Sequence, residues 1–235
     1  MLRIHPSISS TAFFLAGTLA LFFLLGGQMA SEAREISLPK PAEEGRISVE
    51  QAIKARRTIR LFQNKALTLD QLGQLLWAGQ GVTEKGGLGK RAAPSGGGLY
   101  PLELYAVVGR DGVQGLQPGI YRYLPENHSL REVSSGDKRQ DVARAAWGQM
   151  WMAEAPAMLA VAAQYRRITR KYGERGIRYA LIEVGHVGQN ICLQAEALGL
   201  GAGVVGAFED EKVGALLGCP PGEDPLYLLP IGTKH

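Results

Sequence analysis

The longest hydrophobic pattern in the chain has the period of an α-helix. Between Gly176 and Leu198, apolar side chains recur every three to four residues and so share one helix face: Leu181, Val184, Val187, Ile191, Ala195 and Leu198. Two further helices are predicted from capping-box spacings, in which a hydroxyl residue stands three positions before a glutamine. These boxes begin at Ser48 and at Thr68.

Shorter apolar runs predict β-strands. They cover residues 102–108, 119–124, 130–133, 157–163, 203–208 and 226–231. Residues 137–153 and 210–217 have helical patterns, and the glycine-rich stretch 79–98 is predicted to be a loop. Because helices and strands do not alternate strictly, the pattern favours an α+β fold over a doubly wound sheet.

The first 33 residues have the pattern of a targeting segment. The apolar stretch from Ala12 to Leu25 is typical of a signal peptide and short for a bilayer span. Ser31-Glu32-Ala33 offers a cleavage site, and an uncleaved membrane anchor through residues 12–29 is the alternative. Either reading predicts an exported protein that meets a membrane only through this segment. Residues 34–47 are predicted to be a polar linker, and residues 48–235 the folded domain.

Composition narrows the function classes. The 235 residues are 46% hydrophobic, which suits one core. The net charge is only +4, and the chain has no long basic run and no zinc-finger or RNA-binding signature, so nucleic-acid binding is not expected. Cys192 and Cys219 form no CxxC pair, so no metal site is predicted. We interpret them as packing thiols, with a disulfide as the alternative.

One motif resembles a dinucleotide-binding fingerprint in its letters alone. Gly201, Gly203 and Gly206 match G-x-G-x-x-G. That fingerprint must follow a strand and open a helix, whereas these glycines follow the long predicted helix and precede a strand. A Rossmann-type site is therefore not expected.

Four segments have residues suited to a bound ligand. Arg56 to Arg60 (RRTIR) combine guanidinium groups with a hydroxyl, which suits a phosphate, although basic residues also favour a helix C-terminus. Pro94 to Gly98 include three consecutive glycines, which suit a close approach to a flat ligand or an ordinary mobile loop. Residues 183–190 (EVGHVGQN) and 199–208 complete the set, with His186 interpreted as a structural residue.

Together, these segments resemble those of a known protein family. RRTIR, APSGGGLYPLELY, KYGERGIRYALIEVGHVGQN and LGLGAGVVGAF, in this order, resemble the SagB-type dehydrogenase branch of the nitroreductase superfamily. The resemblance runs from about Ser48 to the end of the chain. It implies a nitroreductase-like α+β fold with a mixed or antiparallel central sheet flanked by helices. It also implies a homodimer with FMN at the subunit interface.

The resemblance assigns site residues by position. The residues expected to hold FMN are Arg56, Arg57, Thr58, Arg60, Pro94, Ser95, Gly96, Gln189, Asn190, Val205, Gly206 and Lys234. Among them, Arg56 and Thr58 are expected at the phosphate and Arg60 near the pyrimidine edge of the flavin. Lys171 and Tyr172 match a Lys-Tyr pair implicated in proton removal in azole-forming members, although an exposed basic loop is the alternative.

The function implied is a two-electron oxidoreductase that passes hydride through flavin N5, on a small-molecule or peptide substrate. NADH or NADPH would be the donor for reduction of a nitro or quinone group, whereas azoline oxidation needs an electron acceptor instead. An exported, non-catalytic flavin-binding or interaction protein that keeps the fold is the alternative.

Overall fold

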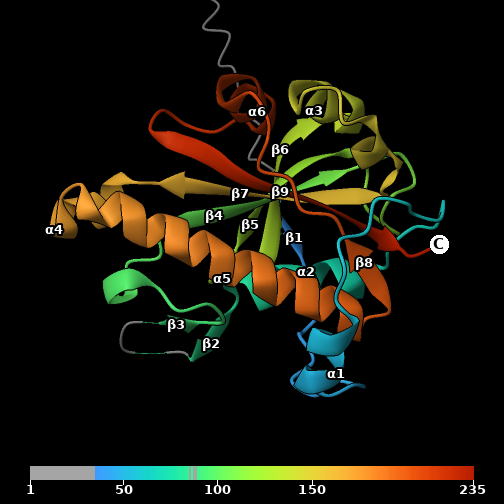
Figure 1. Cartoon of the computed structure of the whole chain (residues 1–235), viewed down its shortest axis with the longest axis horizontal. Helices are drawn as coiled ribbons and strands as arrows, with labels where there is room; N and C mark the ends of the chain where they lie inside the picture. Colours follow the sequence, from blue (N-terminus) through green and yellow to red (C-terminus); the bar gives the residue numbers. More distant parts are fainter. Residues whose placement is uncertain (1–34, 85, 87–88) are drawn as a thin grey trace, which may run out of the picture. The chain divides into compact units, whose positions relative to one another are not determined.

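The computed structural model describes residues 35–84, 86 and 89–235 (Figure 1). Their main sheet has the strand order β1-β6-β5-β4-β7-β9-β8, and all of its pairs are antiparallel. These strands are β1 (Glu35–Ser37), β4 (Leu102–Val108), β5 (Gly119–Leu124), β6 (Ser129–Ser135), β7 (Ala157–Gln164), β8 (Leu200–Ala202) and β9 (Glu223–Thr233). A separate hairpin joins β2 (Val82–Glu84) to β3 (Lys90–Arg91). The predicted α+β class with an antiparallel central sheet is confirmed.

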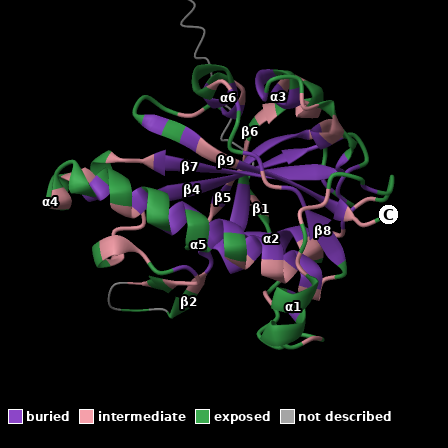
Figure 2. Cartoon of the chain, in the orientation of Figure 1, coloured by how far each residue is buried: buried purple, intermediate pink, exposed green. Residues whose placement is uncertain are grey.

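Helices cover both faces of the sheet, as the purple strands of Figure 2 indicate. On one face, α2 (Leu69–Gln80) and α5 (Arg175–Ala197) pack over Leu104 and its neighbours. On the other, α3 (Arg139–Ala145) and α6 (Asp210–Leu217) pack over Tyr105 and its neighbours. Successive residues of β4 point to opposite faces. The sheet is therefore a rigid, doubly covered support for the segments at its ends.

The helix predictions hold where local signals are strong. α1 (Val49–Ala55) and α2 both begin with the predicted capping boxes, in which the Ser48 and Thr68 hydroxyls accept backbone N–H bonds. α5 and α6 match the predicted ranges closely, and α4 (Arg166–Tyr172) precedes α5. These elements need no distant contact to be recognised, because the caps and the apolar period lie within them.

Three predicted elements differ from the observed ones in their boundaries. The helix expected over 137–153 is divided into α3 and the 3₁₀ helix η2 (Met150–Glu154), because Trp147 and Gly148 have φ of 56° and 72°. The strand expected over 203–208 lies earlier, as β8, and pairs with the end of β9. Stretch 79–98, expected as a loop, includes the end of α2, the β2–β3 hairpin and the 3₁₀ helix η1 (Gly96–Gly98).

The prediction of a polar linker over residues 34–47 also needs correction. Its first described residues form β1, which pairs with the edge of β6. Leu38 is buried, and the backbone of Ala42 exchanges hydrogen bonds of 2.8 and 3.0 Å with the Gln74 side chain. The segment is thus part of the folded domain, because it satisfies the open edge of the sheet.

The targeting predictions for residues 1–33 and the anchor over 12–29 lie outside the described residues and stay predictions. Within the described part, no helix has both the length and the apolar character that a membrane crossing requires. Cys192 and Cys219 are free thiols, as the packing interpretation expected.

Two glycines of α5 lie in very different surroundings. Gly188 faces the protein, where an added Cβ would lie 2.7 Å from Tyr227 Cε1. Gly185 faces away, and an added Cβ would meet nothing within 4 Å. The outward face around Gly185 also exposes large apolar side chains, among them Leu181 and Ile182, which are 52% and 50% exposed. Half of α5 therefore packs inward, and the other half exposes apolar side chains among polar ones such as Arg178 and Gln189.

We predict that Gly188→Ala lowers the free energy of unfolding by about 1–3 kcal/mol, because the new methyl group displaces the Tyr227 ring. Gly185→Ala is the matched control in the same helix, and its higher helix propensity should raise the stability of a single protomer by up to about 1 kcal/mol. Urea unfolding measures both. Equal effects of the two changes would show that α5 does not pack with this face inward.

Candidate functional site

The segment Arg56–Arg60 runs alongside β8. Thr58 forms a β-bridge with Ala202, and the backbone N–H of Ile59 donates to the Ala202 carbonyl at 3.0 Å. A Cβ at Gly201 would lie 2.6 Å from Ile59 Cγ1 and 2.7 Å from Lys234 Cγ. Glycine at 201 thus lets this basic segment and the C-terminus pack directly on β8.

Positive charges gather around this contact. Burial raises the pKa of Cys192 to about 11, while the positive charge of Arg56 acts to lower it, so Arg56 lies beside this part of α5. Lys234 Nζ pairs with Glu196 at 2.6 Å, and the Arg60 guanidinium lies 5.7 Å from the centre of the Trp151 ring. A phosphate would meet Arg56, Arg60 and Lys234 here, the last of them paired with Glu196.

Three other predicted residues of this region have distinct places. Arg57 donates to the carbonyls of Lys54 and Arg56 at 2.9 and 2.8 Å, so it stabilises the C-terminal end of α1. Val205 is buried and bridges to Leu228. Gly206 is exposed, with open space where a Cβ would stand. We call Arg56–Arg60, Lys234 and residues 201–206 the basic flank.

The glycine loop, residues 94–98, lies against α4 and the start of α5. A Cβ at Gly96 would lie 3.2 Å from Ile168 Cδ1 and 3.3 Å from Tyr179 Cβ. Gly97 has a φ of 67°, and its Cβ would lie 2.5 Å from the Tyr172 hydroxyl. Glycines are required here because the aromatic side chains of α4 and α5 approach the loop backbone closely.

The structure brings the predicted Lys-Tyr pair to this loop. Lys171 Nζ would lie 3.2 Å from a Cβ at Gly97, and it lies 5.3 Å from the centre of the Tyr172 ring. The Tyr172 and Tyr179 rings meet edge to face with centres 5.2 Å apart. We call the glycine loop, Lys171 and Tyr172 the loop flank. It holds a cation and a phenol beside an exposed stretch of backbone.

A series of hydrogen bonds, which we call the Glu183 circuit, lies behind the loop. Tyr100 N–H donates to Ser95 Oγ at 2.9 Å, and the Arg91 N–H donates to the Tyr100 hydroxyl at 3.1 Å. Arg91 Nη1 donates to Gln80 Oε1 at 3.1 Å, and Gln80 Nε2 donates to Glu183 Oε1 at 3.4 Å. The Ser95 side chain also lies near Glu183 and acts to lower the pKa of its carboxyl. Tyr100 is held at a φ of 45°, a conformation that needs such support.

Glu183 is the buried acid of this circuit, with 1% of its surface exposed. Burial raises the pKa of its carboxyl to about 7, although Ser95, Gln80 and the positive charge of Arg91 act in the opposite direction. Its Oε2 atom has no hydrogen-bond partner among the described residues. An orphan carboxylate oxygen in the interior is costly, so this group has a reason to bind a proton.

Helix α5 separates the two flanks. Glu183 beside the loop and Cys192 beside Arg56 are nine positions apart, which is about 180° around the helix and about 14 Å along it. Tyr179 and Glu196 are about 25 Å apart along the axis on the same reckoning. Figure 1 shows α4 near one end of α5, and α1 and β8 near the other. The predicted site residues therefore form two groups on opposite sides of one helix.

The remaining predicted site residues, Gln189 and Asn190, lie on α5 itself. Asn190 donates to the carbonyls of Ala78 and Ala92 at 3.1 and 3.3 Å, so it fixes the chain that leads into the glycine loop. Gln189 is exposed on the outward face of α5. Asn190 supports the loop flank from behind, and Gln189 is free to contact a ligand or a second molecule.

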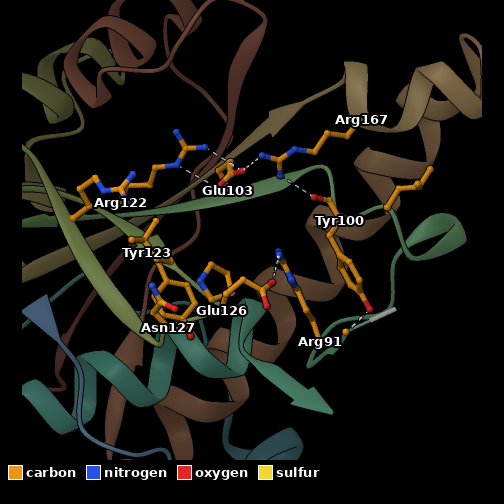
Figure 3. A pocket seen from close by; sticks show the side chains of 13 residues that line it. Arg91, Tyr100, Glu103, Arg122, Tyr123, Glu126, Asn127 and Arg167 are labelled. Carbon is orange, nitrogen blue, oxygen red and sulfur yellow. Dashed lines mark hydrogen bonds and ion pairs between the residues drawn. The ribbon is translucent and has the colours of Figure 1, made fainter. Parts of the chain in front are cut away.

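A polar pocket of about 850 Å³ opens beside the loop flank. Figure 3 shows Glu103 between the guanidinium groups of Arg122 and Arg167, with Tyr100 on one wall. Arg167 also donates to the Tyr100 carbonyl at 3.1 Å. The pocket thus shares the Tyr100 wall with the loop, and its charges are already paired within the protein.

Sequence reasoning missed the roles of Gln80, Arg91 and Glu183. The motif around residue 183 drew attention to the acid, but no local signal joins it to residues about 90–100 positions earlier. An isolated acid on the apolar stripe of a predicted helix is the one available sign, because such a residue must find polar partners inside.

Comparison with known proteins shows to which family the chain belongs. The model of the nitroreductase family matches residues 53–233. The chain belongs to the nitroreductase family. It is 43% identical over 203 residues to a Methanocaldococcus jannaschii protein with a provisional nitroreductase name, covering 86% of this chain and 98% of that relative. The family predicted from the four motifs is confirmed.

Further matches extend the family likeness. The Escherichia coli microcin B17-processing protein is 30% identical over 127 residues, 53% of this chain and 47% of that protein. A Ralstonia eutropha nitroreductase-family structure has a TM-score of 0.75 at 26% identity, covering 87% of this chain and 91% of its own. The fold is also that of a Vibrio harveyi NADPH:FMN oxidoreductase, at a TM-score of 0.57, 22% identity and coverages of 79% and 68%.

We predict that Glu183→Gln stabilises the protein more at high pH than at low pH. The raised pKa means that the native state holds the Glu183 proton more tightly than the unfolded state does, so this group's contribution to stability is present below about pH 4.5 and lost as pH rises through about 7. The difference between variant and wild type should grow by roughly 2–3 kcal/mol from about pH 5 to about pH 8.

Chemical denaturation at the two pH values measures this difference. Comparison with wild type cancels the opposite contribution of groups such as Asp137, whose paired carboxyl has a lowered pKa of about 2. A difference that does not change with pH would mean that Glu183 is ionised throughout.

Proposed function

We propose that the chain is an FMN-dependent oxidoreductase of the SagB-like type, acting on a small-molecule or peptide substrate. The observation that carries the proposal is the close approach of Lys171 and Tyr172 to Gly97, where an added Cβ would lie 3.2 Å from Lys171 Nζ and 2.5 Å from the Tyr172 hydroxyl. The basic flank offers side-chain cations for a phosphate, and the loop flank offers exposed backbone for a ring system, so the residues present fit FMN. The family membership and the flavin-linked structural relative add support.

The active form is proposed to be a homodimer, because one protomer does not bring its two flanks together. The outward face of α5 exposes Leu181 and Ile182 around the open position Gly185. Small residues at a crossing point allow two helices to approach closely. Along the helix axis, the midpoint between Tyr179 and Glu196 lies about 4 Å from Gly185. An antiparallel pairing of two α5 helices would therefore set the loop flank of one protomer beside the basic flank of its partner.

Each flank would then have a separate task. FMN, when bound, supplies the two-electron hydride chemistry. Arg56, Thr58 and Lys234 would bind and orient its phosphate, and Arg60 would place a positive charge near the ring system. Lys171 and Tyr172 would hold and move a proton at the substrate. A lysine acts as a base only where burial or nearby cations favour its neutral form, and cover by a second protomer would supply that burial.

We predict that Arg56→Ala weakens FMN binding by about 1.5–3 kcal/mol, the loss expected for a charge-assisted hydrogen bond. Titration of the protein with FMN, followed by the flavin fluorescence, measures the affinity. Arg57→Ala is the matched control, because Arg57 donates to backbone carbonyls of α1. Equal losses in the two variants would remove Arg56 from the phosphate site.

We predict that Lys171→Ala combined with Tyr172→Phe leaves FMN bound but reduces turnover by about 100-fold or more, the usual contribution of a positioned acid or base. Arg170→Ala is the control for loss of a neighbouring basic residue. Flavin reduction with NADH, NADPH or dithionite, followed in the same cuvette, separates cofactor binding from donor use. Unchanged turnover would favour the alternative, a flavin-binding protein without this catalytic pair.

A further inference from the structure

The charges of the polar pocket beside the loop flank are paired with very different strength. Arg122 and Arg167 both bind Glu103, which is 8% exposed, so this cluster is fixed within the pocket wall. Arg131 instead reaches its partner Glu35 at 3.9 Å, and these two side chains are 51% and 38% exposed. Exposed ion pairs contribute little to stability, so Arg131 keeps most of its capacity to bind another anion. We call this space of about 850 Å³ the arginine pocket.

Two arginines of the pocket stand directly opposite each other in the sheet. Arg131 of β6 pairs in register with Arg122 of β5, so their side chains leave the same face with Cβ atoms about 5 Å apart. Like charges in such a pair are destabilising. The Glu103 carboxylate is already shared by Arg122 and Arg167, so it does little to offset the charge of Arg131. An anion bound beside both guanidinium groups would reduce this repulsion, so the pair is suited to hold one.

Another wall of the pocket has a second loosely paired cation. Arg91 Nη2 meets Glu126 at 3.3 Å, and the Glu126 side chain is 72% exposed on the turn between β5 and β6. The Arg91 guanidinium lies 4.7 Å from the centre of the Tyr100 ring, beside the opening seen in Figure 3. An incoming carboxylate can replace Glu126 at small cost, because exposed pairs are weak. The pocket thus offers two cationic positions, at Arg91 and Arg131, to a ligand with more than one acidic group.

The arginine pocket adjoins the proposed Lys-Tyr pair through α4. Arg167 and Lys171 are four positions apart on this helix, so they share a face and lie about 6 Å apart along its axis. Arg167 also donates to the carbonyl of Tyr100, which follows the glycine loop by two residues, at 3.1 Å. A ligand that fills the pocket as far as Arg167 therefore ends about one helical turn from the Lys171 amine.

We propose that the arginine pocket binds the acidic part of the substrate, so that the substrate is a polycarboxylic acid or an acidic peptide. This inference rests on the proposed function, because that function makes Lys171 and Tyr172 the residues at which the substrate reacts. Guanidinium groups suit carboxylates, since each can donate two parallel hydrogen bonds. The volume of about 850 Å³ suits a small ligand or a few residues of a peptide.

The test measures the binding of three probes to the purified protein, with and without FMN, by isothermal titration calorimetry. Triglutamate represents an acidic peptide, tricarballylate a small polycarboxylic acid, and triglutamine the neutral peptide of the same length. We expect at least one of the acids to bind about tenfold or more tightly than triglutamine, the gain from about one charge-assisted hydrogen bond. The tighter acid identifies the source of the carboxylates. Equal binding of all three probes overturns the inference.

Two variants change the pocket in opposite directions. Arg131→Gln removes a loosely paired cation, and it should weaken binding of the tighter acid by about fivefold to tenfold. Glu126→Gln removes the anion that competes for Arg91, and it should tighten binding by about threefold. Damage to the fold would weaken binding in both variants, so the opposite signs exclude it. Arg144→Gln is the control for loss of an exposed arginine outside the pocket, since Arg144 pairs with Asp141 on α3, and it should have no effect.

A second readout tests whether the bound acid lies beside Lys171. Lysine side chains are acetylated with N-hydroxysuccinimidyl acetate, and mass spectrometry follows the rate at each position. The bound acid should slow acetylation of Lys171, because it covers the approach from the arginine pocket. Lys212, which pairs with Glu209 on α6, is the control and should keep its rate.

The outcomes separate the inference from the proposed function. If the protein fails to bind FMN while the acid binds and depends on Arg131, the proposed function is wrong and the pocket is an acid-binding site without this reaction. If FMN binds but Arg131→Gln leaves acid binding unchanged, or Arg144→Gln weakens it equally, the inference alone is overturned. Unchanged acetylation of Lys171 with the acid bound also overturns it, because the acid would then lie away from the proposed reaction.

Discussion

Helix α5 is the constraint on which the rest of the structure depends. Its inward face packs on α2 and the sheet, through contacts close enough that Gly188 leaves no room for a methyl group beside Tyr227. Its two sides bear different chemistry, because Glu183 and Cys192 lie about half a turn apart around the axis. The helix therefore fixes both the distance and the direction between the basic flank and the loop flank, and it prevents them from meeting within one protomer.

This arrangement gives a physical reason for the proposed dimer. A protomer has cations suited to a phosphate on one side and a Lys-Tyr pair beside a glycine loop on the other. Between them it presents apolar side chains at Leu181 and Ile182, which water solvates poorly. A twofold axis near Gly185 would cover that surface and complete two sites at once. The proposed oxidoreductase function thus needs the dimer for its geometry as well as for its stability.

Local signals in the sequence were sufficient for part of this structure. The capping boxes at Ser48 and Thr68 and the period of α5 predicted helices correctly, because the stabilising groups are neighbours in the chain. The strand expected over 203–208 was misplaced because β8 is determined by pairing with the distant β9. The family motifs pointed to the residues of the two flanks. The circuit around Glu183, however, joins four separate segments of the chain, and no pattern within any of them signals that contact.

Subunit complementation distinguishes a shared site from a site within one protomer. Arg56→Ala impairs only the basic flank, and Gly97→Ala, at a φ of 67° against the Tyr172 hydroxyl, impairs only the loop flank. The two variants are refolded together at an FMN concentration that leaves each alone unbound. If the flanks combine across the dimer, half of the dimers are mixed and each has one intact site, so about one quarter of wild-type FMN binding returns. No recovery of binding would contradict the shared site.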